Sequence, residues 1–405
     1  MAEIPAILIL AGLAAYIILA GADFGAGLWS LLVRPGRMGA AATRDHVRHA
    51  MGPVWEANHV WLIFVLVVCW TAYPEAFGSI FSTLPIPLFA AALGIILRGA
   101  SYALRGQLDD APGRRAIESL FALSSILTPF ALGTVIGAIA AGRVPVGNAK
   151  GGLWSSFTGT TSIMIGTLAV AAGAYLAAVY LSADARRTGA RTAELDFRDR
   201  ALVSGLVAGA LALCGLLVLR DDVPSLWDGL TSGWGLAMVA VSAVAGVVSV
   251  FLVWRRAFEP ARYTAASAVV AIVAGWGIAQ EPRLLPGLTI DQAAAGHTAL
   301  VTVIVGAAIG AAILVPSLVL LFRLFLKGHL DAGASHDVHQ FELPRAAAEP
   351  DTRRLRLLAV AALVIGVGAT VFVGPDWGRV IGVLALFTCA LSTFGLATAG
   401  LGDGD

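Results

Sequence analysis

The amino-acid sequence predicts an all-α integral membrane protein with about eleven transmembrane helices. Of the 405 residues, 58% are hydrophobic and only 13% are charged, and the mean hydropathy is +0.83. A soluble domain carries about 25% charged residues, so a water-soluble core of this size is excluded. The 46 glycines suit closely packed membrane helices. The net charge of +1 gives no indication of nucleic-acid binding.

Apolar segments recur along the chain, each near the ~20 residues that a bilayer core requires. A polar segment, 328–354, separates the last two from the others. It holds His336 and His339 without a further ligand in order, so we expect a cytoplasmic linker rather than a metal site. The expected spans are Ile4–Leu32, Val54–Tyr73, Phe77–Leu97, Ile117–Ala141, Ser156–Leu181, Ala201–Leu219, Gly233–Trp254, Tyr263–Ala279, Leu300–Leu324, Leu355–Val373 and Val380–Ala399.

Basic residues predict the orientation of these spans. Of the 27 Lys and Arg residues, 22 lie in or beside every second connection and 5 lie on the other side. Because loops rich in Lys and Arg face the cytoplasm, we expect the N-terminus outside the membrane and the C-terminus in the cytoplasm.

The stretch Gly52–Leu62 gathers polar side chains at the start of the second span. On a helix that advances about 100° per residue, Trp55, Glu56, Asn58 and His59 fall within one arc. Such a face is costly in a membrane unless it meets protein or water, which indicates a functional site. The alternative for Glu56 is that it only complements the positive end of the helix.

Asp23 lies inside the first span, about 15 Å from its cytoplasmic end at 1.5 Å per residue. A carboxylate there indicates a functional site, and the alternative is a structural salt bridge to Arg98. Arg98 itself closes the third span, where an arginine can equally be a snorkelling anchor. Gly21 and Gly25 have the spacing that lets helices approach closely.

Consecutive helices usually pack side by side, so Asp23 and Glu56 are expected near one another in the cytoplasmic half of the membrane. Two carboxylates with Asn58 and His59 could hold water and relay protons, and burial tunes such groups for that task. The sequence therefore predicts a proton pathway through Asp23, Glu56, Asn58 and His59. No second axial ligand accompanies His59, so no haem is expected in this chain alone.

Two connections and one bend carry specific expectations. Tyr73–Phe77 is expected to be a tight external turn, and the prolines of Pro85–Pro87 are expected to bend the third span. Gln280–Asp291 is rich in prolines and long, which predicts an ordered external loop rather than a hairpin.

Two of these stretches resemble a known family. Gly52–Leu62 resembles the second-helix signature of subunit II of the cytochrome bd quinol oxidases, and Gly21–Gly27 resembles the first-helix signature. Gln280–Asp291 resembles the loop before the family's last helix. The order and spacing agree, and the resemblance runs from about Ile4 to Lys327.

The resemblance implies nine helices in residues 1–327, arranged as two pseudo-symmetric four-helix bundles plus a peripheral helix. It implies a heterodimer with a haem-bearing subunit I in a prokaryotic plasma membrane. Haem b, haem d and quinol oxidation belong to that partner, so this chain holds no complete active site and binds no cofactor alone. Residues 355–405 are an extension with two extra spans, which could lie at the periphery or bind a small accessory subunit.

Residue by residue, the family's membrane carboxylates map onto Asp23 and Glu56. Family members often have Asp where Glu56 stands, so the acid here is one methylene longer. The implied role is a cytoplasmic proton path toward the oxygen-reducing haem site of the partner. Trp55 maps onto the motif tryptophan and is expected, with Arg98, to give structural support.

The leading hypothesis is thus the haem-free subunit of a cytochrome bd-type quinol:oxygen oxidoreductase, which supports subunit I and supplies protons for reduction of oxygen to water. The alternative is a polytopic secondary transporter with membrane-embedded carboxylates. A purely structural scaffold would leave Asp23 and Glu56 unexplained.

Overall fold

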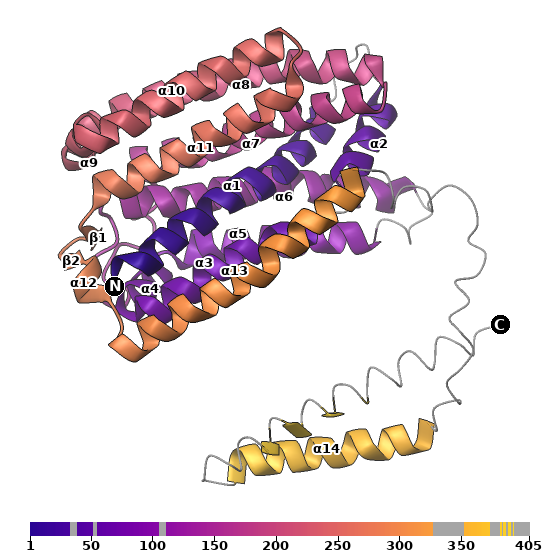
Figure 1. Ribbon diagram of the computed structural model, residues 1–405, viewed down its shortest axis with the longest axis vertical. Coiled ribbons are helices and arrows are strands. Elements are labelled where there is room, and N and C mark those ends of the chain that lie inside the picture. The colour runs from indigo at the N-terminus through magenta and orange to yellow at the C-terminus, as the bar shows by residue number, and fades with distance from the viewer. Residues whose placement is uncertain are drawn as a thin grey trace. The chain divides into compact units, whose positions relative to one another are not determined.

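The computed structural model describes residues 1–32, 39–51, 55–104, 111–326 and 352–372, and a few isolated positions between 381 and 392. Its elements are drawn in Figure 1. They are α1 (Glu3–Leu31), α2 (Ala40–Met51), α3 (Trp55–Ala72), α4 (Pro74–Thr83), α5 (Pro85–Leu104), α6 (Ala111–Ala140), α7 (Thr160–Arg187), α8 (Arg191–Asp222), α9 (Pro224–Leu230), α10 (Gly233–Trp254), α11 (Phe258–Gln280), β1 (Arg283–Leu285), β2 (Leu288–Thr289), α12 (Ile290–Ala293), α13 (His297–Leu326) and α14 (Thr352–Phe372).

The chain divides into two compact units, Met1–Pro316 and Ser317–Asp405. The first unit holds α1 to α12, and α14 belongs to the second. The expected linker 328–354 and most of the expected last span, Val380–Ala399, lie outside the described residues.

Seven of the described helices are long and apolar enough to cross a membrane, namely α1, α6, α7, α8, α10, α11 and α13. The helices α3 and α4 meet at a 120° bend and make an eighth candidate if they count as one broken span. Two shorter apolar helices occur within α5 and α14. The described part of the chain therefore provides fewer clear spans than the eleven expected from hydropathy.

Prolines account for one error of the sequence-based prediction. The chain bends by 120° at Tyr73, where the sharp turn was expected, but Pro74–Phe77 form the first turn of α4 rather than a loop. The expected third span is likewise two helices, with α5 starting at Pro85. Proline at the first helical position has no unsatisfied N–H and a favourable φ, so it starts a new helix rather than bending an old one.

The helix α1 lies at the centre of the first unit (Figure 1). It packs against α3, α6, α7 and α11. The helix α5 packs on α6, while α7 packs on α8 and α11, and α10 packs on α8 and α11. The stretch Ala20–Gly27 of α1 is therefore buried among neighbouring helices.

Glycines make the contact between α1 and α7. A Cβ at Gly25 would overlap the backbone carbonyl of Gly173, and Gly21 faces the same residue. The close packing expected from Gly21 and Gly25 is thus observed, and it allows the two backbones to touch. Trp29, one turn further, donates its indole N–H to the Ala174 carbonyl at 2.8 Å.

The connection after α11 contains a short hairpin, so the expectation of a loop without a hairpin is wrong. The strands β1 and β2 pair antiparallel, with Arg283 opposite Thr289 and Leu285 opposite Leu288. Both leucines are buried, and the burial of these two side chains stabilises a hairpin that the prolines alone did not suggest. The end of this connection is joined to α3, because the Ala295 N–H donates to the Ala72 carbonyl at 2.8 Å.

Candidate functional site

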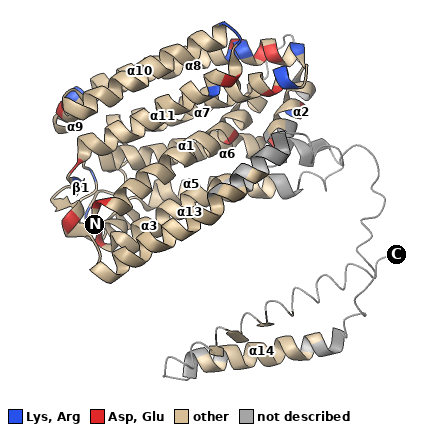
Figure 2. Cartoon of the chain, in the orientation of Figure 1, with Lys and Arg blue, Asp and Glu red and all other residues tan. Residues whose placement is uncertain are grey.

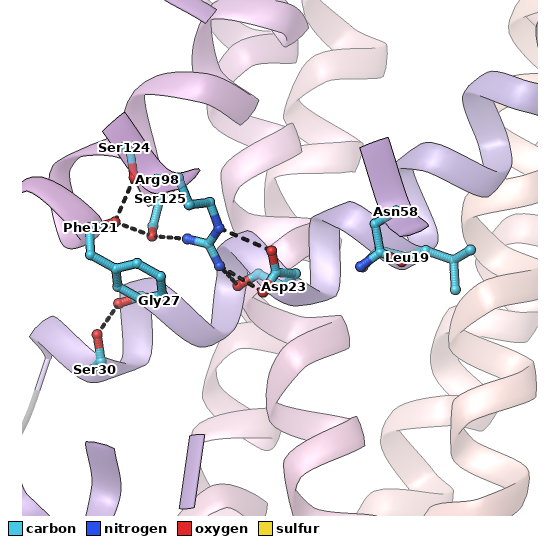
Figure 3. A network of polar contacts seen from close by, with 9 residues as sticks. All are labelled: Leu19, Asp23, Gly27, Ser30, Asn58, Arg98, Phe121, Ser124 and Ser125. Atoms are coloured by element: carbon cyan, nitrogen blue, oxygen red, sulfur yellow. Dashed lines mark hydrogen bonds and ion pairs between the residues drawn. The ribbon is translucent and has the colours of Figure 1, made fainter. Parts of the chain in front are cut away.

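Asp23 on α1 and Arg98 on α5 form a buried bidentate ion pair (Figure 3). Arg98 Nη2 lies 2.7 Å from Asp23 Oδ1, and Arg98 Nε donates to Asp23 Oδ2 at 3.0 Å. Nη2 also donates to the Asp23 carbonyl at 2.8 Å. The side chains are 0% and 1% exposed. Arg98 is therefore not a snorkelling anchor, and the salt bridge weighed for Asp23 is present.

A second layer of groups satisfies the guanidinium. Arg98 Nη1 donates to Ser125 Oγ on α6 at 2.7 Å, and the Ser125 hydroxyl donates to the Phe121 carbonyl at 2.6 Å. The Arg98 Cζ lies 4.2 Å from the ring centroid of Phe121 and 5.0 Å from that of Phe24. A buried charge is tolerated when it is paired, hydrogen-bonded and stacked in this way.

The helix backbones bring these groups together. A Cβ at Gly27 on α1 would overlap Ser125 Oγ, so glycine at this position lets α6 come close enough to place its serine against Arg98. The neighbouring Ser124 turns its hydroxyl to the Phe121 carbonyl at 2.7 Å. Only Ser125 of the two serines contacts the arginine in Figure 3.

The helix α3 is fastened to α1 beside this pair. Asn58 Nδ2 donates to the Leu19 carbonyl at 3.3 Å, and the asparagine is 5% exposed. The imidazole of His59 contacts Tyr16 and Phe24, with ring centroids 6.0 Å and 5.9 Å away. The structure thus brings Asp23, Asn58 and His59 together around one side of α1.

Tyr16 is a site residue that the sequence analysis missed. Its side chain is 5% exposed, and its hydroxyl has no hydrogen-bond partner among the described residues. Its position relative to Asp23 carried the signal, because residues at i and i+7 lie on one helix face. A buried hydroxyl usually has a partner, and an internal water is the ordinary one where protein groups are lacking.

Glu56 and Trp55 occupy the first turn of α3. Their side chains lie outside the described residues, so the expected approach of Glu56 to Asp23 stays a prediction. On the helix, Glu56 precedes His59 by three residues, and the two therefore lie on adjacent turns of one face.

His59 lies among aromatic side chains, because its imidazole is flanked by the rings of Tyr16 and Phe24. Within the described residues, no group of three or more His, Cys, Asp or Glu side chains is arranged to hold a metal ion. The chemistry of the site is therefore that of a fixed ion pair, an imidazole, an amide and a hydroxyl.

The fold and this site define a helical membrane protein whose charged groups are sequestered between helices. The sequence profile described as "Cytochrome bd terminal oxidase subunit II" matches residues 1–325. The chain belongs to that family.

Relatives and a solved structure agree with this assignment. The chain is 26% identical over 120 residues to "Cytochrome bd ubiquinol oxidase subunit 2" of Bacillus subtilis, which covers 30% of this chain and 34% of the relative. It is 22% identical over 237 residues to a provisionally named cytochrome bd menaquinol oxidase subunit II of the same organism, 57% of this chain and 67% of the relative.

The fold is similar to a chain of the bd oxidase structure from Geobacillus thermodenitrificans. The TM-score is 0.62 at 27% identity, and the match covers 80% of this chain and 98% of the other. The family profile ends at residue 325, and residues 326–405 lie beyond it.

Proposed function

We propose that this chain is the haem-free subunit of a quinol oxidase, which packs against a haem-bearing subunit I and guides protons toward its oxygen-reducing site. The observation that supports the proton role is the buried group of Asp23, Arg98, His59 and Tyr16 between α1, α3 and α5. A membrane core is a costly place for such groups unless they serve a function. Haem b, haem d and the bound quinol are assigned to the partner.

The Asp23–Arg98 pair is a fixed part of the proposed path. Because its two charges neutralise each other and Asp23 Oδ1, Asp23 Oδ2 and Arg98 Nη1 each have a partner, the pair orients the neighbouring dipoles without carrying a net charge. The rigid geometry of the pair would position water near the hydroxyl of Tyr16, which lies on the same helix, α1, as Asp23.

The proposed order of proton carriers follows α3. Glu56 lies at the first turn of the helix, His59 one turn deeper, and the Tyr16 hydroxyl beside the His59 ring. Asn58 holds α3 against α1 through the Leu19 carbonyl, so that the imidazole stays beside the hydroxyl. A proton moves between such groups only when they lie within hydrogen-bond reach directly or through one water.

The proposed architecture divides the helices of the first unit into two sets. In one set α1 contacts α3 and α6, and α6 contacts α5. In the other, α7, α8, α10 and α11 contact one another, while α1 and α6 also pack closely on α7 across the two sets. We assign these sets as the two pseudo-symmetric bundles and α13 as the peripheral helix. With the basic loops in the cytoplasm, the N-terminus is outside and the C-terminus inside a prokaryotic plasma membrane.

The C-terminal extension has two proposed roles that the resemblance leaves open. It could lie at the edge of the heterodimer, or it could bind a small accessory subunit. Family membership disfavours the transporter hypothesis, since that hypothesis rested on the number of spans and a membrane carboxylate alone.

Oxygen consumption by the purified complex tests the proton role. We predict that Glu56→Gln slows turnover by about a hundredfold, the low end of what a positioned proton-transfer group contributes, while both haem types remain bound. Asp23→Asn should slow turnover in the same direction and also lower stability, because it leaves Arg98 without its partner. Tyr16→Phe removes only the hydroxyl and should slow turnover in the same direction.

Ser124→Ala is the matched control, because Ser124 is buried beside the site but bonds the Phe121 carbonyl rather than Arg98. Full turnover of both the Glu56 and the Asp23 variants across the working pH range would contradict the proposed path. Loss of haem together with turnover would instead assign these residues to assembly.

A further inference from the structure

Basic residues, with acidic residues among them, lie at the end of the first unit where α7 ends and α10 turns into α11 (Figure 2). A pocket of about 470 Å³ opens there, lined by the four arginines Arg186, Arg187, Arg255 and Arg256 together with the start of α11. We propose that this pocket, named here the arginine pocket, binds the phosphate group of an acidic phospholipid.

The charge of the arginine pocket is largely uncompensated. Arg187 pairs with Asp184 at 2.6 Å, and the lining carboxylate of Glu259 lies 3.4 Å from Arg262, which is outside the pocket. In the part of the chain that the structure describes, Arg255 and Arg256 have no carboxylate within salt-bridge distance. Basic pockets between membrane helices are typical binding sites for anionic lipid headgroups.

Backbone geometry fixes two of the arginines at the mouth of the pocket. The helix α10 closes with Arg256 N–H donating to the Val253 carbonyl at 3.0 Å and Ala257 N–H donating to the Leu252 carbonyl at 2.8 Å. Arg256 has φ +61° in this turn, a conformation that favours glycine. The guanidinium of Arg186 donates to the Arg256 carbonyl, so the end of α7 is tied to the same turn.

The start of α11 adds a favourable field. Its first residues, Phe258 to Pro260, line the pocket, and no side chain caps the helix at Ala257. The free N–H groups at a helix start attract anions, and phosphate is a common ligand there. Four arginines and the start of α11 therefore line one volume.

Aromatic residues near the pocket indicate a lipid rather than free phosphate. Trp254 ends α10 with 55% of its surface exposed, and Phe251 and Tyr263 are 52% and 72% exposed on the adjoining turns. Exposed Trp and Tyr mark the level of lipid headgroups in membrane proteins. The arginine pocket thus lies where an acidic headgroup would meet it, with acyl chains along α10 and α11.

The test is lipid binding to the purified complex in detergent, measured by native mass spectrometry with phosphatidylglycerol, phosphatidylcholine and inorganic phosphate as separate probes. Arg256→Gly removes a guanidinium and suits the φ of the turn, so this variant should fold. Arg255→Gln removes a second one. Arg220→Gln is the matched control. Arg220 is an exposed arginine near the end of α8, whereas the arginine pocket lies near the start of that helix, just after α7.

We expect the wild-type complex to prefer phosphatidylglycerol over phosphatidylcholine, and each pocket variant to bind phosphatidylglycerol about fivefold more weakly. Arg220→Gln should leave binding unchanged. If inorganic phosphate displaces the lipid and the two variants weaken phosphate binding equally, the arginine pocket is a phosphate site whose ligand is free phosphate. Unchanged phosphatidylglycerol binding in the Arg255→Gln/Arg256→Gly double variant would overturn the proposal.

Discussion

Two aspartate–arginine pairs in the first unit have the same chemistry but different surroundings. Asp23 and Arg98 are 1% and 0% exposed and join α1 to α5, whereas Asp222 and Arg143 are 23% and 35% exposed at the edge of the bundle. Asp222 also accepts hydrogen bonds from the Thr161 hydroxyl at 2.5 Å and the Thr161 N–H at 3.3 Å.

The difference teaches how burial changes what a salt bridge does. Water screens the Arg143–Asp222 pair and can replace either partner, so the pair mainly joins the ends of three helices. The Asp23–Arg98 pair has no such substitute, and each charge depends on the other to remain in the membrane core. A pair of this second kind persists at a high desolvation cost, which suits a functional site better than a stabilising one.

The largest expected effect on stability follows from removing one partner of the buried pair. Arg98→Met leaves the Asp23 carboxylate without its partner, and we predict a loss of about 3–5 kcal/mol in the free energy of unfolding. Denaturant titration of the purified complex, followed by the helical circular dichroism signal, measures it. The double variant Asp23→Leu/Arg98→Met removes both charges and should recover most of the loss; a double variant as unstable as Arg98→Met would contradict this reasoning.

The contact between α1 and α7 gives the next effect. Gly25→Ala places a Cβ against the Gly173 carbonyl, and overpacking of this kind costs about 1–3 kcal/mol. The same titration measures the loss. Gly209→Ala on α8 is the control, because a Cβ there meets no atom within 4 Å; equal losses in both variants would show that helix propensity, not the close contact, sets the result.

A smaller effect is expected where α3 is fastened to α1. Asn58→Ala removes the hydrogen bond to the Leu19 carbonyl and should lower the unfolding free energy by about 1 kcal/mol. If the amide positions His59, turnover falls by more than stability does, and comparing oxygen consumption with the titration separates the two. A variant with unchanged turnover would limit Asn58 to packing.

The exposed pair gives the smallest effect. Arg143→Met should change the unfolding free energy by no more than about 1 kcal/mol, since partly exposed pairs contribute little and are screened by salt. Raising the salt concentration should narrow the difference between this variant and the wild type. A loss as large as that of Arg98→Met would remove the distinction between the two pairs.

Sequence reasoning reached the membrane class and the family because hydropathy and short motifs are local properties. It also anticipated Asp23, Arg98 and the glycines Gly21 and Gly25, since rare charges and small residues stand out in apolar helices. It divided α4 and α5 wrongly because a proline can either bend a helix or begin one, and only packing decides between them.

The residues that surround Arg98 on α6 could not be predicted from local sequence patterns. Ser125 and Phe121 are ordinary residues of an apolar helix, and their contact with Arg98 depends on how α6 lies against α1 at Gly27. Tyr16 could have been predicted as a site residue, because it shares a helix face with Asp23. The hairpin after α11 was missed because the prolines of this connection were interpreted as features of an irregular loop. Pro286–Gly287 is in fact a turn signature, Gly287 has φ +77°, and the burial of Leu285 and Leu288 adds to the stability of the hairpin.

The most direct test of the proposed function is a reduced-minus-oxidised visible spectrum of the complex that co-purifies with a tagged copy of this chain, compared with the spectrum of the His59→Phe variant. The proposal predicts b- and d-type haem bands in both preparations, with equal amounts per complex, because no haem depends on this chain's histidine. A colourless wild-type preparation would contradict the assignment to a quinol oxidase, and loss of a haem band in His59→Phe would contradict the haem-free role.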